Sequence, residues 1–322
     1  MPPAGSRLAP GAEFDLIRRF LAAGRGGAHP DVPVGPGDDC AVVTGDGIAL
    51  SVDMSVEGVH FRRDWLKPAE IGWRATAAAL SDLAAVAARP VGVLASLSVP
   101  EADAGNFSLR VMEGVTAAVR AVGGVILGGD LTRSPGPLVV DVVAVGQCSS
   151  PVLRSGARVG DEVWVTGELG GSGSFVASRL AGRRARAGAR ERFAHPVPRI
   201  REALRLHELG IPTAMLDLSD GIAGDAGHIA AASGVALSIE TQLLPVHPSA
   251  TVELALTGGE DYELCFTAAP GAVDRVGAEF AETGVRLTRV GRVAAGSGVW
   301  LVDGAGERRR PGRGFQHFEE AT

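Results

Sequence analysis

The sequence predicts a two-domain protein of the α/β (α+β) class. At 322 residues the chain is too long for one typical domain and long enough for two, each with its own core. Strand-like and helix-like segments alternate through both halves, and Ser, Pro and Gly gather at residues 149–160 between them. We therefore predict an N-terminal domain over residues 1–150 and a C-terminal domain over residues 151–322.

The predicted elements follow from apolar periodicity and from the positions of Pro and Gly. Residues 68–88 carry Pro in the first turn and an Ala-rich face, which is typical of a closely packed helix. Residues 221–233 form a second clear helix, which follows an acidic turn with helix-capping chemistry at 217–220 and ends at Gly234. Further helices are predicted at 104–122, 198–209 and 272–283, and strands at 47–52, 93–99, 125–127, 138–147, 161–166, 235–239, 262–267, 287–293 and 299–302.

The composition argues against several classes of protein. Hydrophobic residues make up 46% of the chain and charged residues 21%, as in a globular protein rather than a disordered one. The formal net charge of -6 argues against a nucleic-acid or acidic membrane partner. We interpret the one basic cluster as a solvated linker or helix face; it consists of Arg183, Arg184, Arg186, Arg190 and Arg192.

The cysteines indicate the cellular compartment, and the single lysine excludes some classes of phosphate-binding site. Cys40, Cys148 and Cys265 lie far apart without metal-ligand spacing, which favours a reducing compartment. Residues 1–20 show no apolar segment behind a basic stretch, and no run of about 18 apolar residues occurs, so we expect a cytoplasmic protein. Lys67 is the only lysine, and the lysine that P-loop NTPases and protein kinases place against phosphates is therefore missing.

Acidic residues at strand ends and helix starts are the main functional signal. Asp38 and Asp39 precede an apolar strand and Asp53 ends the next one, although such residues are also common as solvated turn formers. Asp82 lies inside an apolar helix, where Asp has poor propensity and no basic residue follows four positions later. A metal ligand explains Asp82 better than a core residue does, because a buried carboxylate without a partner is costly.

Three motifs combine acidic residues with glycine. They occupy residues 128–130, 217–221 and 258–263, and the last surrounds Tyr262, the only tyrosine, with three acids. Glycine lets a backbone approach a ligand closely. Each motif alone is also explained as a capping or structural turn.

Together these acidic turns predict a magnesium site. Two like charges at 4 Å cost about 4 kcal/mol at an effective dielectric of 20, so carboxylates that converge need cations. Hard oxygen ligands favour Mg²⁺, which joins carboxylates to substrate phosphates, and several ions are expected. Arg133 and Arg154 supply fork-shaped donors for phosphate oxygens. The sequence therefore predicts phosphoryl transfer, and an acceptor that is itself an ionised phosphate needs no general base.

With these motifs in place, the sequence resembles the thiamine-monophosphate kinase family of the AIR-synthetase-like superfamily over essentially the whole chain. The resemblance rests on GDDCAV at 37–42, VEGVHF at 56–61, LSDLAA at 80–85, GGD at 128–130, RSGARVGD at 154–161, DLSDG at 217–221 and TGGEDYEL at 257–264. Each stretch is weak alone, whereas their order and spacing are specific. The resemblance implies a two-domain AIR-synthetase-like fold with mixed sheets flanked by helices, a homodimer paired through its N-terminal domains, and ATP held between domains.

The resemblance also implies an activity and its residues. The activity is a transferase reaction of thiamine biosynthesis, in which ATP and thiamine monophosphate give thiamine diphosphate and ADP. The implied metal ligands are Asp39, Ser51, Val52, Asp53, Asp82, Asp130, Asp217 and Asp220. ATP would contact Gly129, Asp130, Arg154 and Ser219, of which Asp130 and Arg154 would be catalytic, while His60, Glu260 and Phe315 would face thiamine.

Two of these positions depart from the family pattern. Val52 stands where a hydroxyl residue is common, so a metal contact there would use its main-chain carbonyl. Phe315 stands where Tyr or Trp is expected; it keeps an apolar ring for stacking and lacks the polar handle.

Alternatives of two kinds stay open. An aminoimidazole ribonucleotide synthetase is the enzyme alternative, and a non-catalytic nucleotide- or metal-binding paralogue is the other. A selenophosphate synthetase would carry reactive Cys and Lys residues near its start, but no Cys precedes Cys40 and no Lys precedes Lys67. A hydrogenase-maturation protein would end in a reactive Cys, whereas this chain ends in Thr322.

Overall fold

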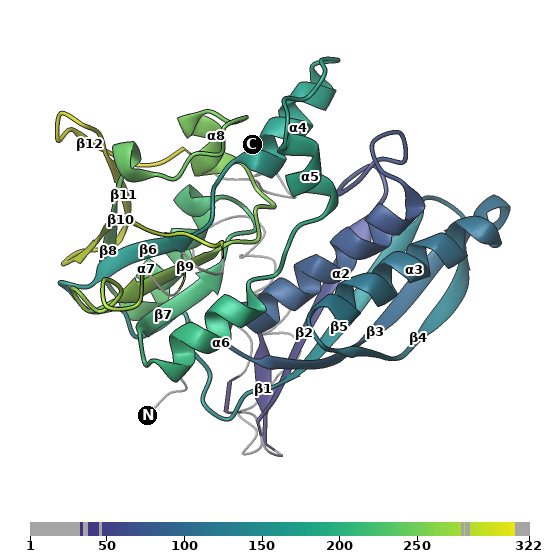
Figure 1. Cartoon of the computed structure of the whole chain (residues 1–322), viewed down its shortest axis with the longest axis horizontal. Coiled ribbons are helices and arrows are strands. Elements are labelled where there is room, and N and C mark those ends of the chain that lie inside the picture. The colour runs from purple at the N-terminus through teal and green to yellow at the C-terminus, as the bar shows by residue number, and fades with distance from the viewer. Residues whose placement is uncertain (1–32, 35–37, 45–46, 278–279, 281–283, 313–322) are drawn as a thin grey trace, which may run out of the picture.

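Two β-sheets with helices packed on them make up the chain (Figure 1). The computed structural model describes residues 33–34, 38–44, 47–277, 280 and 284–312. A five-stranded sheet from the first half has the order β1-β2-β5-β3-β4, and a seven-stranded sheet from the second half has the order β12-β11-β8-β10-β6-β9-β7. Each is mixed, since β3 and β4 run parallel, as do β8 and β11, among antiparallel neighbours. The predicted α/β (α+β) class with mixed sheets is confirmed.

The first half places two helices on one face of its sheet (Figure 1). They cross closely because Gly72 and Gly114 meet the backbone of the opposite helix, where a Cβ would collide with a carbonyl group. The elements of this half are β1 (Ala41–Val43), β2 (Ile48–Val56), α2 (Pro68–Ala85), β3 (Arg89–Pro100), the 3₁₀ turn η1 (Glu101–Asp103), α3 (Asn106–Ala121), β4 (Val125–Ser134) and β5 (Val139–Gln147).

Helix α2 is buried on nearly all sides. It packs against β2 and β5 of the first sheet and against α6 and β7 of the second half. Small side chains such as Ala77, Ala79 and Ala84 let both halves approach it, and they are fully buried. This explains the Ala-rich sequence of the helix and makes α2 the seam along which the two halves meet.

The second half continues the alternation of helices and strands. Its second apolar core lies between α7 and the seven-stranded sheet and contains residues of this half alone. The elements are β6 (Glu162–Thr166), α4 (Gly171–Leu180), α5 (Ala189–Ala194), α6 (Ile200–Glu208), β7 (Pro212–Asp217), α7 (Ile222–Ser233), β8 (Ala236–Glu240), η2 (Thr241–Leu243), α8 (Val252–Thr257), β9 (Leu264–Ala268), β10 (Leu287–Ala294), β11 (Gly298–Val302) and β12 (Arg308–Arg309).

Two local predictions were wrong. Residues 128–133 do not form a turn but continue β4, because each pairs with a residue of the parallel strand β3. The acidic turn before α7 does not cap that helix with a side chain; Gly221 is the N-cap residue, at a φ of 98°. The predicted helix at 272–283 lies partly outside the described residues.

Candidate active site

Three carboxylates from distant parts of the chain converge at the seam between the halves. Asp39 precedes β1, Asp82 lies in the last turn of α2, and Asp217 ends β7. One oxygen atom of each lies within 4.8 Å of the others. The strand end, the helix turn and the loop thus form one acidic cluster, which we define as Asp39, Asp82 and Asp217.

The acidic cluster carries more negative charge than its surroundings neutralise. Burial and the neighbouring Asp39 raise the pKa of Asp217 to about 8. Burial and the charges of Asp217, Asp39 and Asp53 raise the pKa of Asp82 well above its usual value. The buried Oδ2 atom of Asp217 has no hydrogen-bond partner among the described residues. This arrangement fits a bound cation, because a cation removes the repulsion that raises both pKa values.

Among the described residues, Arg154 supplies the one guanidinium group that touches the acidic cluster. Its Nε and Nη2 atoms donate to the two carboxylate oxygens of Asp39 at 2.7 and 2.8 Å. Burial opposes its charge, but Asp39 and Asp38 raise the pKa of Arg154, so the group stays cationic. Its backbone N–H also donates to Asp38, whose pKa burial and Asp39 raise to about 6.

Strand β2 presents predicted ligands on its inner face. The Ser51 hydroxyl donates to Asp82, and the charge of Asp53 acts on the same carboxylate. Because successive strand residues alternate between faces, the Val52 side chain points the other way and is 65% exposed. Only main-chain atoms of Val52 remain near this face.

Asp130 and Gly129 lie apart from the acidic cluster. They belong to the edge strand β4, where Asp130 pairs with Ser96, which pairs with Asp141, which in turn pairs with Met54 of β2. Three strand spacings of about 4.8 Å separate β4 from β2. Paired residues share a face, so the Asp130 side chain lies with that of Met54, on the face opposite Asp53. Within one chain, Asp130 does not join the cluster.

The motifs at 217–221 and 258–263 pack directly against each other. The backbone N–H groups of Glu260 and Tyr262 donate to the carbonyls of Ser219 and Leu218 at 2.7 and 2.9 Å. Glu260 and Tyr262 have positive φ angles of 68° and 51°, which side-chain-bearing residues rarely adopt. Gly259 allows the contact, since a Cβ there would lie 2.5 Å from the Ser219 carbonyl oxygen.

The remaining predicted substrate residues fall into three cases. Glu260 forms an ion pair with Arg74 of α2, and so faces the seam. The Nδ1 atom of His60 accepts a hydrogen bond from the backbone N–H of Val56 at 3.1 Å, which fixes the ring. Phe315 lies outside the described residues.

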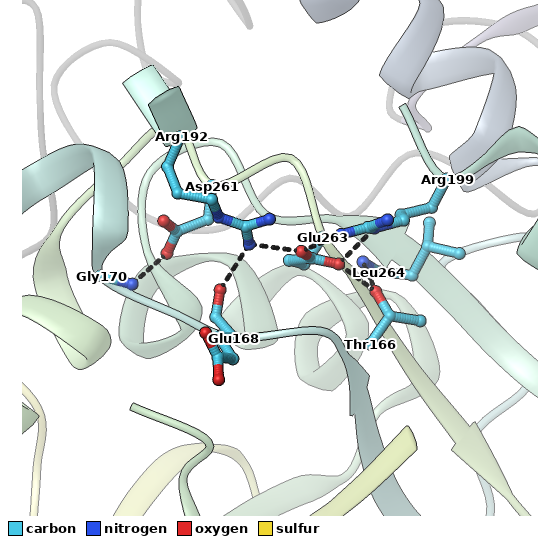
Figure 2. Close-up of polar contacts among 8 residues, drawn as sticks. All are labelled: Thr166, Glu168, Gly170, Arg192, Arg199, Asp261, Glu263 and Leu264. Carbon is cyan, nitrogen blue, oxygen red and sulfur yellow. Dashed lines mark hydrogen bonds and ion pairs between the residues drawn. The ribbon is translucent and has the colours of Figure 1, made fainter. Parts of the chain in front are cut away.

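A second buried ionic group is centred on Glu263, at the end of the 258–263 segment (Figure 2). Glu263 accepts hydrogen bonds from Arg192 and from both Nε and Nη2 of Arg199, all at 2.6 Å, and from the Thr166 hydroxyl at 2.7 Å. Burial alone would raise the pKa of Glu263, but Arg199 and Arg192 hold it below its usual value. We call these four residues the Glu263 network. It fastens the start of β9 to α5 and α6.

Two polar residues of α7 were missed from the sequence. Asp225 is buried and accepts a hydrogen bond from the backbone N–H of Asp220 at 3.0 Å. Burial and the charge of Asp220 raise its pKa well above the usual value. Burial and Arg154 lower the pKa of His228 to about 4. The signal for Asp225 was the one used for Asp82, an Asp inside an apolar helix.

Comparison with known proteins identifies the family to which this fold and this acidic cluster belong. The family model "AIR synthase related protein, N-terminal domain" matches residues 37–148, and "AIR synthase related protein, C-terminal domain" matches residues 158–303. The chain belongs to this family of AIR synthase related proteins.

Full-length relatives narrow the family further. The chain is 35% identical to the thiamine-monophosphate kinase of Rhodopirellula baltica, over 94% of this chain and 98% of the relative. It is 33% identical to that of Escherichia coli K12, over 95% and 98%. A solved structure of AaThiL complexed with AMPPCP and TMP is 30% identical and covers 95% of this chain and 97% of that one, with a TM-score of 0.81. Within its family, the chain belongs with the thiamine-monophosphate kinases, and the resemblance drawn from the motifs is confirmed.

The helices give one further result. None in the described part of the chain is both long and apolar enough to cross a membrane.

Proposed function

We propose that this enzyme transfers the γ-phosphoryl group of ATP to thiamine monophosphate, giving thiamine diphosphate and ADP. The convergence of Asp39, Asp82 and Asp217 at the seam carries the proposal, because phosphoryl transfer needs cations gathered around phosphate oxygens. The similarity to thiamine-monophosphate kinases and to a structure that holds AMPPCP and TMP supports this choice of substrates. A cytosolic location stays a prediction.

Magnesium is the cofactor that the acidic cluster fits. Its ligands are carboxylate oxygens, the Asp217 Oδ2 atom lacks a hydrogen-bond partner among the described residues, and no histidine belongs to the cluster. We assign Mg²⁺ to Asp39, Asp82 and Asp217, with Asp53, Asp220, the Ser51 hydroxyl and the Val52 carbonyl as further ligands. When bound, Mg²⁺ neutralises phosphate oxygens on ATP and on the acceptor.

The chain's other residues orient the reactants. Arg154, held by Asp39 at the edge of the cluster, is placed to donate to phosphate oxygens, and Ser219 follows Asp217 by two residues in the 217–221 turn. Glu260, which pairs with Arg74 at the seam, and His60 are assigned to thiamine, together with Phe315. The acceptor is an ionised phosphate, so no residue is needed to remove a proton from it, and direct in-line transfer suffices.

The place of Asp130 supports a homodimer. Val52 and Met54, 65% and 54% exposed, and Leu94, 37% exposed, give the uncovered face of the first sheet an apolar surface. Asp130 lies on this face. In a two-fold dimer that pairs these faces, Gly129 and Asp130 of one protomer would approach the ATP phosphates held by its partner. Each active site would then contain residues of both subunits.

Product formation tests the activity. The purified chain, incubated with ATP, Mg²⁺ and thiamine monophosphate, is expected to form thiamine diphosphate and ADP in equal amounts. The Asp82→Asn variant and a reaction with excess EDTA serve as controls, and both should give no product. Nucleotide binding without product would favour the non-catalytic paralogue, and turnover of formylglycinamidine ribonucleotide alone would favour the synthetase alternative.

Mixed dimers test the shared site. Asp130→Asn and Asp217→Asn should each abolish turnover, and Asp130→Asn should leave the fold intact because its side chain is exposed. If Asp130 acts in the partner's site, a mixed dimer keeps one intact site, and co-refolding equal amounts of both variants should restore about a quarter of wild-type activity. If each site belongs to one chain, both sites of the mixed dimer are defective and the activity stays absent.

A further inference from the structure

A pocket of about 590 Å³ opens beside the N-terminal end of α2. Its walls come from four segments: the loop before α2, helix α4, the stretch between α4 and α5, and the first turn of α5. Its volume is that of a small-molecule site rather than a surface for a polymer. Among its described lining residues Asp64 is the only carboxylate, whereas six cationic side chains line the pocket: Arg63, Lys67, Arg179, Arg184, Arg186 and Arg190.

Part of this positive charge is already neutralised. Arg63 pairs with Glu57 and Asp103, and Arg190 pairs with Glu70 at 2.7 Å. Asp64 lies 3.0 Å from Arg62 and 3.9 Å from Arg179, so one carboxylate serves two guanidinium groups.

Three cations are left over. Lys67, Arg184 and Arg186 have no acidic partner within the part of the chain that the structure describes. Arg184 and Arg186 belong to the basic cluster that the sequence alone presented as a solvated linker. The fold instead directs them toward Lys67 from a segment more than a hundred residues away.

Unneutralised cations around one cavity repel each other, and a bound anion removes that cost. Three positive charges match the charge of a diphosphate near neutral pH. The pocket also has an apolar wall, formed by Trp65 and Phe175, whose ring centroids lie 6.0 Å apart. Such a wall suits the organic part of a ligand.

We propose that this pocket is a second anion site, which binds a small organic diphosphate or triphosphate. It is separate from the site of phosphoryl transfer, because Lys67 and Asp82 mark the two ends of α2. Fifteen residues of helix at 1.5 Å each place about 22 Å between them. A phosphate held by Arg184 and Arg186 is therefore not the one transferred at the acidic cluster.

Calorimetric titration with inorganic pyrophosphate tests the proposal. The full chain is titrated in excess EDTA at 0.15 M salt, because metal-free carboxylates repel an anion and leave the pocket as the favourable site. Wild-type protein is expected to bind one pyrophosphate per chain. The Arg184→Gln/Arg186→Gln variant should weaken binding at least about tenfold, since it removes two charge-assisted hydrogen-bond donors.

Arg183→Gln is the matched control. It removes one charge from the same stretch, where the pocket variant removes two, but Arg183 does not line the pocket, and binding should change by less than about twofold. Asp217→Asn should also leave binding in place, because it lies at the other end of α2. Equal losses in the pocket variant and the Arg183 control would overturn the proposal, as would the absence of pyrophosphate binding to wild type.

Three further ligands define the occupant. Thiamine diphosphate and ATP, titrated under the same conditions, should compete with pyrophosphate, and the tighter of the two identifies the organic part. The Asp217→Asn variant should show the same competition as the wild-type protein. Binding of a single-stranded oligonucleotide that depends on Arg184 and Arg186, without competition by pyrophosphate, would assign these side chains to a polymer surface and overturn the pocket.

Discussion

The acidic cluster and the Glu263 network are both buried groups of charge, and they are built in opposite ways. The cluster joins three carboxylates, and Arg154 is the one described cation in contact with them, whereas the network surrounds one carboxylate with two guanidinium groups and a hydroxyl. The pKa of Asp217 is raised to about 8, while that of Glu263 is held below its usual value. The acidic cluster lacks positive charge, as expected of a site that binds a cation. The charge of the Glu263 network is already neutralised, as expected of a group that stabilises the fold.

The 258–263 segment connects the acidic cluster to the Glu263 network. The 258–263 segment carries Glu260 and the positive φ angles at one end and Glu263 at the other. Strain of about 1–3 kcal/mol per such residue persists only where the surroundings hold it. The Glu263 network holds this strained segment in place. The segment in turn fixes the turn after Asp217, because its backbone N–H groups donate to the Ser219 and Leu218 carbonyls.

The largest expected effect comes from removing a charge in the acidic cluster. Asp217→Asn should lower kcat by at least about 10³-fold, equal to about 4 kcal/mol, because a lost ligand charge acts on the transition state. The same change should raise the thermal stability of the metal-free protein by about 1–3 kcal/mol, since it removes a repelled buried carboxylate. Kinetics and thermal melting in EDTA measure the two effects. A destabilised variant would show that the cluster is a structural network like the one around Glu263.

Charge removal in the Glu263 network should have the opposite effect on stability. Glu263→Gln leaves Arg192 and Arg199 with no carboxylate between them, and breaking a buried pair in this way costs about 3–5 kcal/mol. Denaturant unfolding measures the loss. Glu208→Gln is the control, because its pair with Arg205 is exposed and is worth less than about 1 kcal/mol. Equal changes in both variants would remove the distinction between the two regions.

The sequence allowed the acidic cluster to be predicted in part, but not the Glu263 network. Asp82 was predicted as a metal ligand because a carboxylate inside an apolar helix is conspicuous, whereas the ligand roles of Asp39 and Asp217 came from the family resemblance; the structure brings these three together. The Glu263 network was not predicted, because Arg192 lies in α5, Arg199 lies directly before α6, and salt-bridge partners leave no local pattern. The same limit hid the meeting of Arg184 with Lys67.

Local rules also misplaced one motif. Two glycines at 128–129 favour a turn, but pairing with β3 supplies a partner for each backbone group and extends the strand. Long-range pairing outweighed local preference there. By contrast, α2 and β5 were predicted to within three residues at each end, because apolar periodicity and Pro68 are local signals.

Asp261 offers a test by pH on the side of the Glu263 network. Burial raises its pKa to about 7, although the backbone N–H of Gly170 donates to it at 2.6 Å. The folded chain therefore keeps a proton that the unfolded chain releases near pH 4, and stability falls as pH rises from about 4 to about 7. The contribution is at most roughly 4 kcal/mol, from three pKa units.

Asp261→Asn should remove this contribution. Its stability, followed by denaturant unfolding at pH 5, 6, 7 and 8, should vary less with pH than that of wild type, and Asp303→Asn, an exposed carboxylate, serves as the control. Identical pH profiles for wild type and Asp261→Asn would mean that Asp261 is ionised in the fold.

The smallest expected effect is stabilisation by the metal itself. Mg²⁺ at a hundred times its dissociation constant should add about 2.7 kcal/mol to the free energy of unfolding. Because the folded, metal-free chain holds a proton on Asp217 up to about pH 8, Mg²⁺ must displace it below that pH. At one fixed Mg²⁺ concentration, the rise in melting temperature should therefore be larger at pH 8.5 than at pH 6.5. Asp141→Asn, whose carboxylate lies on the far face of the sheet with Asp130, should keep this response, while Asp82→Asn should lose it. A response that survives in Asp82→Asn would place the metal outside the acidic cluster and end the contrast with the Glu263 network.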